Sequence, residues 1–134
     1  MPVPGSPEEP SVRRHQDLTI TVERLGGVAV VAVDGEVDLC TVPMLRDVLE
    51  ATSNRAPWRI VVDLSLVRFL NAAGLEVLID AQRVAGPGTD LRLVATTRAT
   101  WRPLQLTGTH ERLPVHASRA ATVAAPRRRA ADTG

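Results

Sequence analysis

The stretch FLNAAGLEVL, residues 69–78, decides the fold of this chain. Apolar residues run up to Leu70, and beyond the turn they recur at the three- and four-residue spacing of a helix as far as Ala85. Asn71 stands between the two patterns, where a helix N-cap belongs. The stretch therefore predicts a buried strand that turns directly into a helix. Such junctions often carry chemistry, but this one offers only an amide, two methyl groups and a glycine.

The same patterns continue outward on both sides of the junction. Repeated strand–helix–strand units predict a mostly parallel sheet, and the first two strands add an antiparallel hairpin. We therefore expect an α/β fold with one mixed, mostly parallel sheet and helices packed largely on one face. The expected strands cover residues 18–24, 28–33, 59–64, 91–95 and 113–116. The expected helices run from a cap at Thr41 to residues 53–54, from the junction to residue 85, over residues 99–106, and onward from a cap at Ser118.

Length and composition predict one globular domain. The chain has 134 residues, of which 44% are hydrophobic and 23% charged. Aromatic residues make up only 2%, so the core must be aliphatic. We expect the domain to cover residues 17–125. A disordered leader rich in Pro and charge covers residues 1–16, and a disordered basic tail covers residues 126–134.

The charge and hydropathy patterns narrow the class of partner. A formal net charge of +1 argues against general attraction to nucleic acid. No apolar run reaches the length that spans a bilayer. The first residues contain Pro, Glu and Arg where a signal peptide has an apolar stretch. We therefore expect a cytoplasmic protein that binds neither nucleic acid nor membrane.

The sequence contains few features that are typical of an enzyme. It has no glycine-rich phosphate loop and no Gly-x-Ser-x-Gly elbow, and the place of a nucleophile is taken by Ala73. The histidines, His15, His110 and His116, lack metal-ligand spacing, so we expect no metal, no cofactor and no catalytic residue. The single Cys40 excludes an internal disulfide. Because its neighbours are apolar, we interpret it as a small buried core residue.

Two local features remain, and both follow predicted strands. One is the acidic segment Asp34–Asp38, and the other runs from Asp63 to Leu75. In a parallel sheet these strand ends lie at one edge, where α/β proteins place their sites. A purely structural interpretation stays open, with Gly35 as a turn, Asp38 as an anion near a helix start and Asn71 as a cap.

Together these features resemble a known family. The segments DGEVDLCTVPMLRDVL (34–49), VVDLSLVRFLNAAGLEVLIDAQR (61–83) and LRLVA (91–95) look like the STAS domain of bacterial anti-sigma factor antagonists. The resemblance covers residues 18–124 and agrees with the expected order of elements. It implies a protein that binds an anti-sigma factor and so frees a sigma factor. The implied partner is a serine kinase with a histidine-kinase-type ATPase fold, which phosphorylates the antagonist and breaks the complex.

The resemblance also assigns the site. The family's Asp-Ser-Ser/Thr-Gly segment falls on residues 71–74, so the phosphorylated position is Ala73, whose side chain has no oxygen, and Asp38 matches the acidic loop residue near that position. The resemblance implies a partner-binding set of Gly35, Glu36, Asp38, Asn71, Ala72, Ala73, Gly74 and Leu75.

Two hypotheses about function follow. The first is an antagonist that still binds its partner but is not phosphorylated at the usual position, with Thr41, Ser65 and Thr107 as possible substitute acceptors. The second is a STAS scaffold or sensor subunit that joins other STAS proteins in a larger signalling or transport complex.

Overall fold

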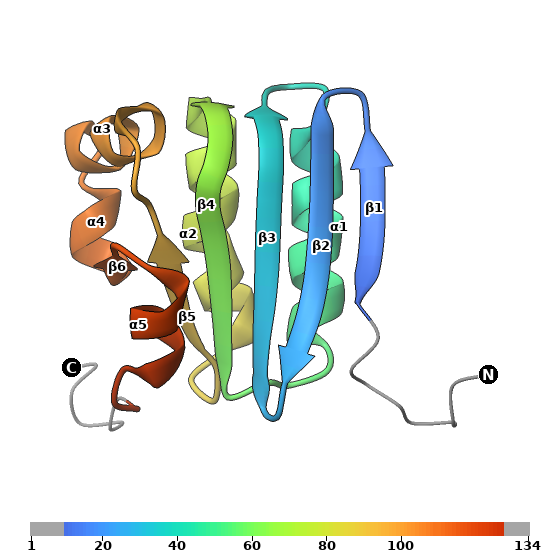
Figure 1. The fold of residues 1–134 in the computed structure, drawn as a ribbon, viewed down its shortest axis with the longest axis vertical. Coiled ribbons are helices and arrows are strands. Elements are labelled where there is room, and N and C mark those ends of the chain that lie inside the picture. The colour runs from blue at the N-terminus through green and yellow to red at the C-terminus, as the bar shows by residue number, and fades with distance from the viewer. Residues whose placement is uncertain (1–9, 128–134) are drawn as a thin grey trace.

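The computed structural model describes residues 10–127, which form one six-stranded sheet with helices on both faces (Figure 1). The strands lie side by side in chain order. The first two pairs are antiparallel and the other three are parallel, which confirms the predicted mixed, mostly parallel α/β sheet. The strands are β1 (Ser11–His15), β2 (Leu18–Leu25), β3 (Val28–Val37), β4 (Arg59–Leu70), β5 (Asp90–Val94) and β6 (Val115–His116). The helices are α1 (Val42–Ser53), α2 (Ala72–Ala85), α3 (Arg98–Leu106), α4 (Thr109–Arg112) and α5 (Arg119–Ala124).

The two longest helices, α1 and α2, cover one face of the sheet and lie behind the strands in Figure 1. Each has an apolar face that packs against the inward side chains of β2 to β5. This core is aliphatic, as the composition predicts, and includes Leu18, Ile20, Leu45, Ile60, Leu64, Leu78, Leu91 and Leu93. The short helix α5 lies on the opposite face, against β4 and β5.

Arg59 explains how α5 is held on that face. Its side chain is fully buried at the start of β4, where Nη2 lies 2.8 Å from Oδ2 of Asp90. Nη1 donates to the carbonyl oxygens of Thr122, at 3.0 Å, and Ala125, at 2.6 Å. Carbonyls at the C-terminal end of a helix attract a cation. The guanidinium therefore ties the end of α5 to two strands of the sheet.

The sequence-based boundaries are wrong at both ends of the domain. Residues 11–15, expected in the disordered leader, form β1, which pairs with β2 along its whole length. At the other end, the carbonyl of Pro126 accepts hydrogen bonds from Arg59 at 3.1 Å and Arg92 at 3.3 Å. The expected tail therefore begins with a residue that is bonded to the sheet. The rest of the predicted leader and tail, at residues 1–9 and 128–134, lies outside the described residues.

Two strands are also longer than predicted. β3 and β4 reach Val37 and Leu70 instead of residues 33 and 64, because their parallel pairing continues through two register shifts. Most of the predicted acidic loop is therefore strand. The short helix α4 was not predicted, and the last strand covers only Val115–His116 of the expected 113–116.

Candidate functional site

The two candidate segments meet at the carboxyl ends of β3 and β4, at the top of Figure 1. Glu36 lies opposite Phe69 in the ladder, and Val37 lies opposite Leu70. One step further, the backbone N–H of Asn71 donates to the carbonyl of Val37 at 3.1 Å. The strand ends therefore lie at one edge, as the parallel arrangement predicts.

Gly35 shapes this edge through its backbone. Its φ of +129° is unfavourable for residues with a side chain, and a Cβ here would overlap the carbonyl oxygen of Asp17. The adjacent Glu36 N–H donates to that same carbonyl at 3.3 Å. Gly35 therefore lets the end of β3 pass close to the turn between β1 and β2, and it offers a partner no side chain.

Asp38 organises the turn into α1. Its Oδ1 accepts from the backbone N–H groups of Cys40, at 2.9 Å, and Thr41, at 3.1 Å. The Thr41 hydroxyl donates to the carbonyl of Glu36 at 2.8 Å and makes no capping bond to α1. Thr41 occupies the predicted N-cap position, but the expected capping role of its side chain is wrong. The hydroxyl points back toward β3, and the Asp38 carboxylate accepts hydrogen bonds from the backbone N–H groups of the turn instead.

Asn71 begins α2 as predicted. It has extended backbone dihedral angles, and its Oδ1 accepts from the N–H of Gly74 at 2.9 Å. The N–H groups of Ala72 and Ala73 make no hydrogen bond to another residue in the described part of the chain. Two backbone donors at the positive end of a fourteen-residue helix therefore stay open.

Gly74 brings α2 close to the sheet. A Cβ at this position would lie 2.7 Å from Cγ1 of Val37 and 2.9 Å from Cδ1 of Leu70. Both distances are shorter than carbon–carbon van der Waals contact. The helix start therefore sits directly on the ends of β3 and β4, and this contact sets the position of Ala73 relative to Asp38.

Exposure separates the residues that a partner can touch from those that position them. Leu75 is only 5% exposed and packs in the core, so its predicted place in the partner-binding set is wrong for direct contact. Two apolar residues that the prediction missed are exposed instead: Leu39, at 77%, and Phe69, at 49%. The accessible residues form what we call the strand-exit surface: Glu36, Asp38, Leu39, Phe69, Asn71, Ala72 and Ala73.

Cys40 lies beside this surface and is exposed, so its interpretation as a buried core residue is wrong. Its apolar neighbour Leu39 is exposed with it, because both follow the last buried residue of β3, Val37. Apolar sequence neighbours indicate burial only within a regular element, and this turn is not one.

The three possible substitute acceptors are all engaged. The Thr41 hydroxyl is buried in the turn described above. The Ser65 hydroxyl donates to Oδ1 of Asp63 at 2.6 Å, and the Thr107 hydroxyl donates to the carbonyl of Pro103, on α3, at 2.7 Å. Of the three, Thr41 lies nearest to the strand-exit surface in sequence and is the least accessible.

Asp63, on β4, is a second buried charge that is paired with an arginine. Burial alone raises the pKa of this carboxyl group, but hydrogen bonds from Ser65 and the charged side chain of Arg119 outweigh it. The net effect lowers the pKa of Asp63. Nη2 of Arg119 lies 2.9 Å from Oδ2 of Asp63, so this pair links α5 to the middle of β4.

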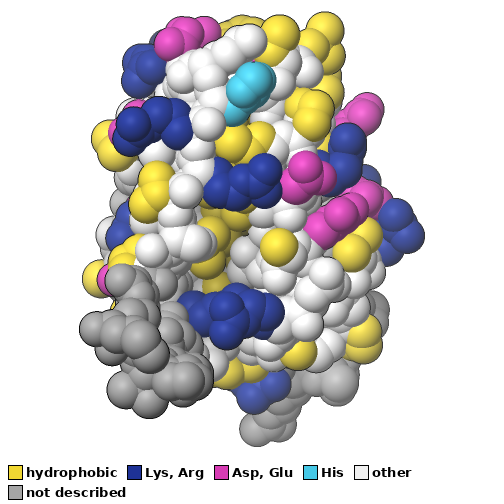
Figure 2. Space-filling model, turned by 90° about the vertical axis from the view of Figure 1, so that its right-hand side faces the viewer, with side chains coloured by type: hydrophobic (Ala, Val, Ile, Leu, Met, Phe, Trp, Pro, Cys, Tyr) yellow, Lys and Arg dark blue, Asp and Glu magenta, His cyan; other side chains and the backbone are white. Residues whose placement is uncertain are grey.

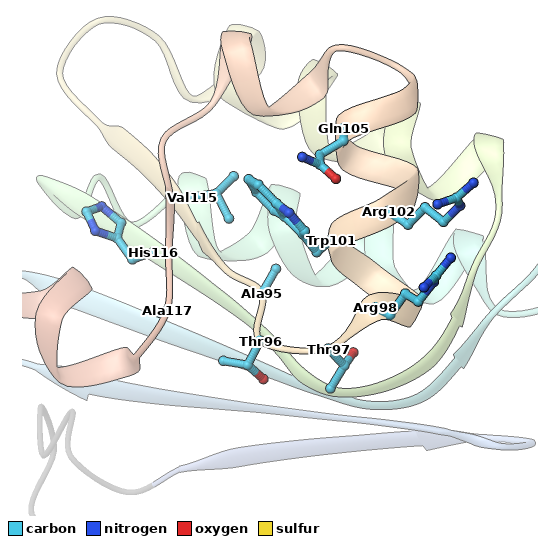
Figure 3. Close-up of a pocket in the computed structure, with 10 residues that line it drawn as sticks. All are labelled: Ala95, Thr96, Thr97, Arg98, Trp101, Arg102, Gln105, Val115, His116 and Ala117. Carbon is cyan, nitrogen blue, oxygen red and sulfur yellow. The ribbon is translucent and has the colours of Figure 1, made fainter.

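A cavity of about 600 Å³ lies between α3 and the strand β6. Trp101 and Gln105 point across it toward Val115, whereas Arg98 and Arg102 extend from the other flank of α3 (Figure 3). The His116 ring points away from Trp101 in the same view.

The histidines do not come together. Nε2 of His116 lies 3.1 Å from Nη1 of Arg92, and burial followed by the charges of Arg92 and Arg59 lowers the pKa of His116. His110 lies on α4, where its Nδ1 is 3.2 Å from the carbonyl oxygen of Leu104, and His15 is on β1. Within residues 10–127, no three side chains of His, Cys, Asp or Glu gather as metal ligands do. No helix in the same range is long and apolar enough to span a membrane.

Comparison with known proteins finds a matching family model and related anti-sigma factor antagonists. A family model described as "Mlab, STAS domain" matches residues 20–115. The anti-sigma-F factor antagonist RsfB of Mycobacterium tuberculosis is 35% identical over 91 residues, which cover 68% of this chain and 75% of the relative. The crystal structure of an anti-sigma factor antagonist from Mycobacterium paratuberculosis is 36% identical, with a TM-score of 0.77, and the match covers 79% of this chain and 91% of that one.

The fold extends to more distant structures. The anti-sigma factor antagonist SpoIIAA in its unphosphorylated form, from Bacillus, superposes with a TM-score of 0.64 at 17% identity. The match covers 77% of this chain and 92% of that one. At this identity the likeness concerns the fold alone.

Proposed function

Because the chain belongs to the STAS-domain family, we propose that it is an anti-sigma factor antagonist that binds through the strand-exit surface and is not phosphorylated at the family's usual position. The names of its relatives support the antagonist activity. The observation that carries the second part is Ala73, a residue without a side-chain oxygen in the first turn of α2.

The strand-exit surface has the chemistry of a protein-binding patch. Leu39 and Phe69 offer exposed apolar area, while Glu36 and Asp38 add carboxylates beside it. The backbone beneath is fixed by the Asp38 turn and by the close contact at Gly74. A rigid surface loses little conformational entropy when a partner binds, so this fixed geometry favours association.

The arrangement around Ala73 explains why a hydroxyl here would act as a switch. The free N–H groups and the helix dipole at the start of α2 stabilise a phosphate. The same group would place charge and bulk in the middle of a packed interface and break it. With a methyl group at this position, the surface keeps the shape of the unmodified state.

The resemblance to the family indicates the kind of partner. We expect an anti-sigma factor with a histidine-kinase-type ATPase fold in the cytoplasm, and we expect this chain to act by binding instead of catalysis. We expect this chain to bind neither nucleic acid nor a membrane.

A sigma-release assay tests the proposal. Each anti-sigma factor of the source genome is purified in complex with its sigma factor, and release of the sigma factor is measured as the chain is added. We expect the wild-type chain to release sigma from at least one complex, with or without ATP. Failure with every complex would refute antagonist activity.

Variants locate the surface. Ala73→Glu places a carboxylate in the centre of the strand-exit surface and is expected to abolish release. Val84→Glu is the matched control, because it adds the same charge near the other end of α2, where Val84 is 48% exposed. Equal loss in both variants would place the binding surface elsewhere.

The scaffold hypothesis predicts a different result in the same setting. A chain that joins other STAS proteins or transporter subunits would bind them and leave every complex of sigma and anti-sigma factor intact. The missing hydroxyl would then reflect a protein that never had a kinase partner.

A further inference from the structure

A narrow groove runs between β1 and β2, at one edge of the sheet, and the second half of α1, and it shares no residue with the strand-exit surface. It encloses about 180 Å³. Figure 2 views this side of the molecule and shows a strip of apolar side chains, with arginine side chains lying across it. The apolar residues that line the groove are Ile20, Val22, Val48 and Ala51.

The charges in this groove have one sign. Arg13, Arg24 and Arg55 line it, and no carboxylate does. Between residues 10 and 127, none of these three side chains forms an ion pair or a side-chain hydrogen bond. By contrast, Arg59 and Arg92 on the same sheet are both paired with a carboxylate.

Two of these arginines oppose each other. Arg24 and Arg55 line the same groove, and burial and then the charge of Arg55 lower the pKa of Arg24. Like charges above an apolar floor destabilise each other, and an anion placed between them would remove that repulsion. Guanidinium groups bind carboxylates in a planar, two-bond geometry.

We propose that this groove binds a small organic anion with an apolar chain, with the anionic group between Arg24 and Arg55 and the chain along Val22, Val48 and Ala51. A medium-chain carboxylate is the simplest member of this class. The volume lies below the roughly 300–1,000 Å³ of pockets that hold drug-sized ligands, which favours a slender chain over a ring system. Such a ligand has an anionic group that matches the arginines and an apolar chain that matches the apolar floor of the groove.

Octanoate is the first probe, in a titration of the full-length, isotope-labelled chain followed by NMR. We expect saturable shifts at the amides of Val22, Val48 and Ala51. Octanol lacks the charge and acetate lacks the chain, so each is expected to bind at least about tenfold more weakly. Octanol binding as tightly as octanoate would overturn the role of the arginines. Octanoate shifts elsewhere, or shifts that do not saturate, would overturn the site.

Substitutions then test the two charges. Arg24→Gln and Arg55→Gln are each expected to weaken octanoate binding about tenfold or more. Arg14→Gln is the matched control on β1, because Arg14 points to the opposite face and donates to Thr19, so its affinity should stay within about twofold. Unchanged affinity in both groove variants would overturn the proposal.

A fold control and a competing ligand complete the test. Removing one of two like charges should leave the melting temperature of each groove variant equal to or above that of the wild-type chain. A melting temperature that falls in both variants would contradict the repulsion on which the proposal rests. Binding of a glutamate-rich peptide in the absence of any octanoate binding would instead assign the groove to an acidic protein segment and refute the small-anion proposal.

Discussion

The close contact between α2 and the strand ends predicts the effect of one methyl group. Gly74→Ala adds a Cβ that would lie 2.7 Å from Val37 Cγ1 and 2.9 Å from Leu70 Cδ1. Overpacking of this kind costs about 1–3 kcal/mol. Replacing glycine by alanine in a helix returns at most about 1 kcal/mol. The two terms together allow a net destabilisation of about 0–3 kcal/mol, and we expect about 1–2 kcal/mol because neither contacting group lies on a flexible exposed side chain.

Gly88→Ala is the matched control for this substitution. A Cβ at Gly88 has no neighbour within 4 Å. The substitution should therefore leave stability unchanged or raise it by up to about 1 kcal/mol through the unfolded state. Urea unfolding followed by circular dichroism measures both variants, and an unchanged m value would show that the unfolded state stays comparable. If Gly74→Ala were as stable as Gly88→Ala, the close approach of α2 to β3 and β4 would be refuted.

Three further predictions concern the exposed thiol and the buried charges. Cys40 should react with a thiol reagent in the native chain as fast as it does in urea, and a large protection factor would contradict its exposure. Burial alone raises the pKa values of Asp63 and Asp90. Hydrogen bonds and charges from neighbouring arginines outweigh burial and lower both pKa values, and Ser65 also lowers the pKa of Asp63 by hydrogen bonding. Their contribution is therefore complete above the unfolded pKa of about 4 and is lost as pH falls through the lower folded pKa values, so acid unfolding curves of Asp63→Asn should flatten in that window. Arg59→Met leaves a buried carboxylate and several carbonyls without their donor and should cost about 3–5 kcal/mol, whereas a loss below about 1 kcal/mol would contradict its role in holding α5.

The sequence predicts most of the fold because its signals are local. Asn71 caps α2 and Ser118 caps α5 through bonds to amides three residues ahead, and this chemistry depends on nothing distant. Strand β1 gave no such signal. All its side chains are exposed, so it has no apolar period, and only its pairing with β2 makes it a strand.

The sequence predicted where the candidate site lies, but not which of its residues can contact a partner. The position of Ala73 and the meeting of the two strand ends follow from the order of elements and from the family resemblance. Which neighbours face a partner depends on the direction of each side chain after the last ladder pair. For this reason Leu39 and Phe69 were missed, and Leu75, which lies in the core, was assigned to the surface.

The groove beside α1 could not be predicted from the sequence for a related reason. Arg13 lies on β1, Arg24 on β2 and Arg55 in the turn after α1, and each alone is an ordinary surface charge. The packing of α1 against β2 brings Arg24 and Arg55 to one apolar floor, and the unpredicted strand β1 adds Arg13.

The most direct test of the central claim is mass spectrometry of the chain and of its Ala73→Ser variant, after incubation with ATP and the anti-sigma factor that the chain binds. We predict that the wild-type chain gains no phosphate and that the variant gains one, at residue 73. Phosphate on the wild-type chain at any residue of the strand-exit surface or at Thr41 would contradict the loss of the switch. A variant that binds the anti-sigma factor and still gains no phosphate would contradict the claim that this helix start retains the geometry of a phosphorylation site.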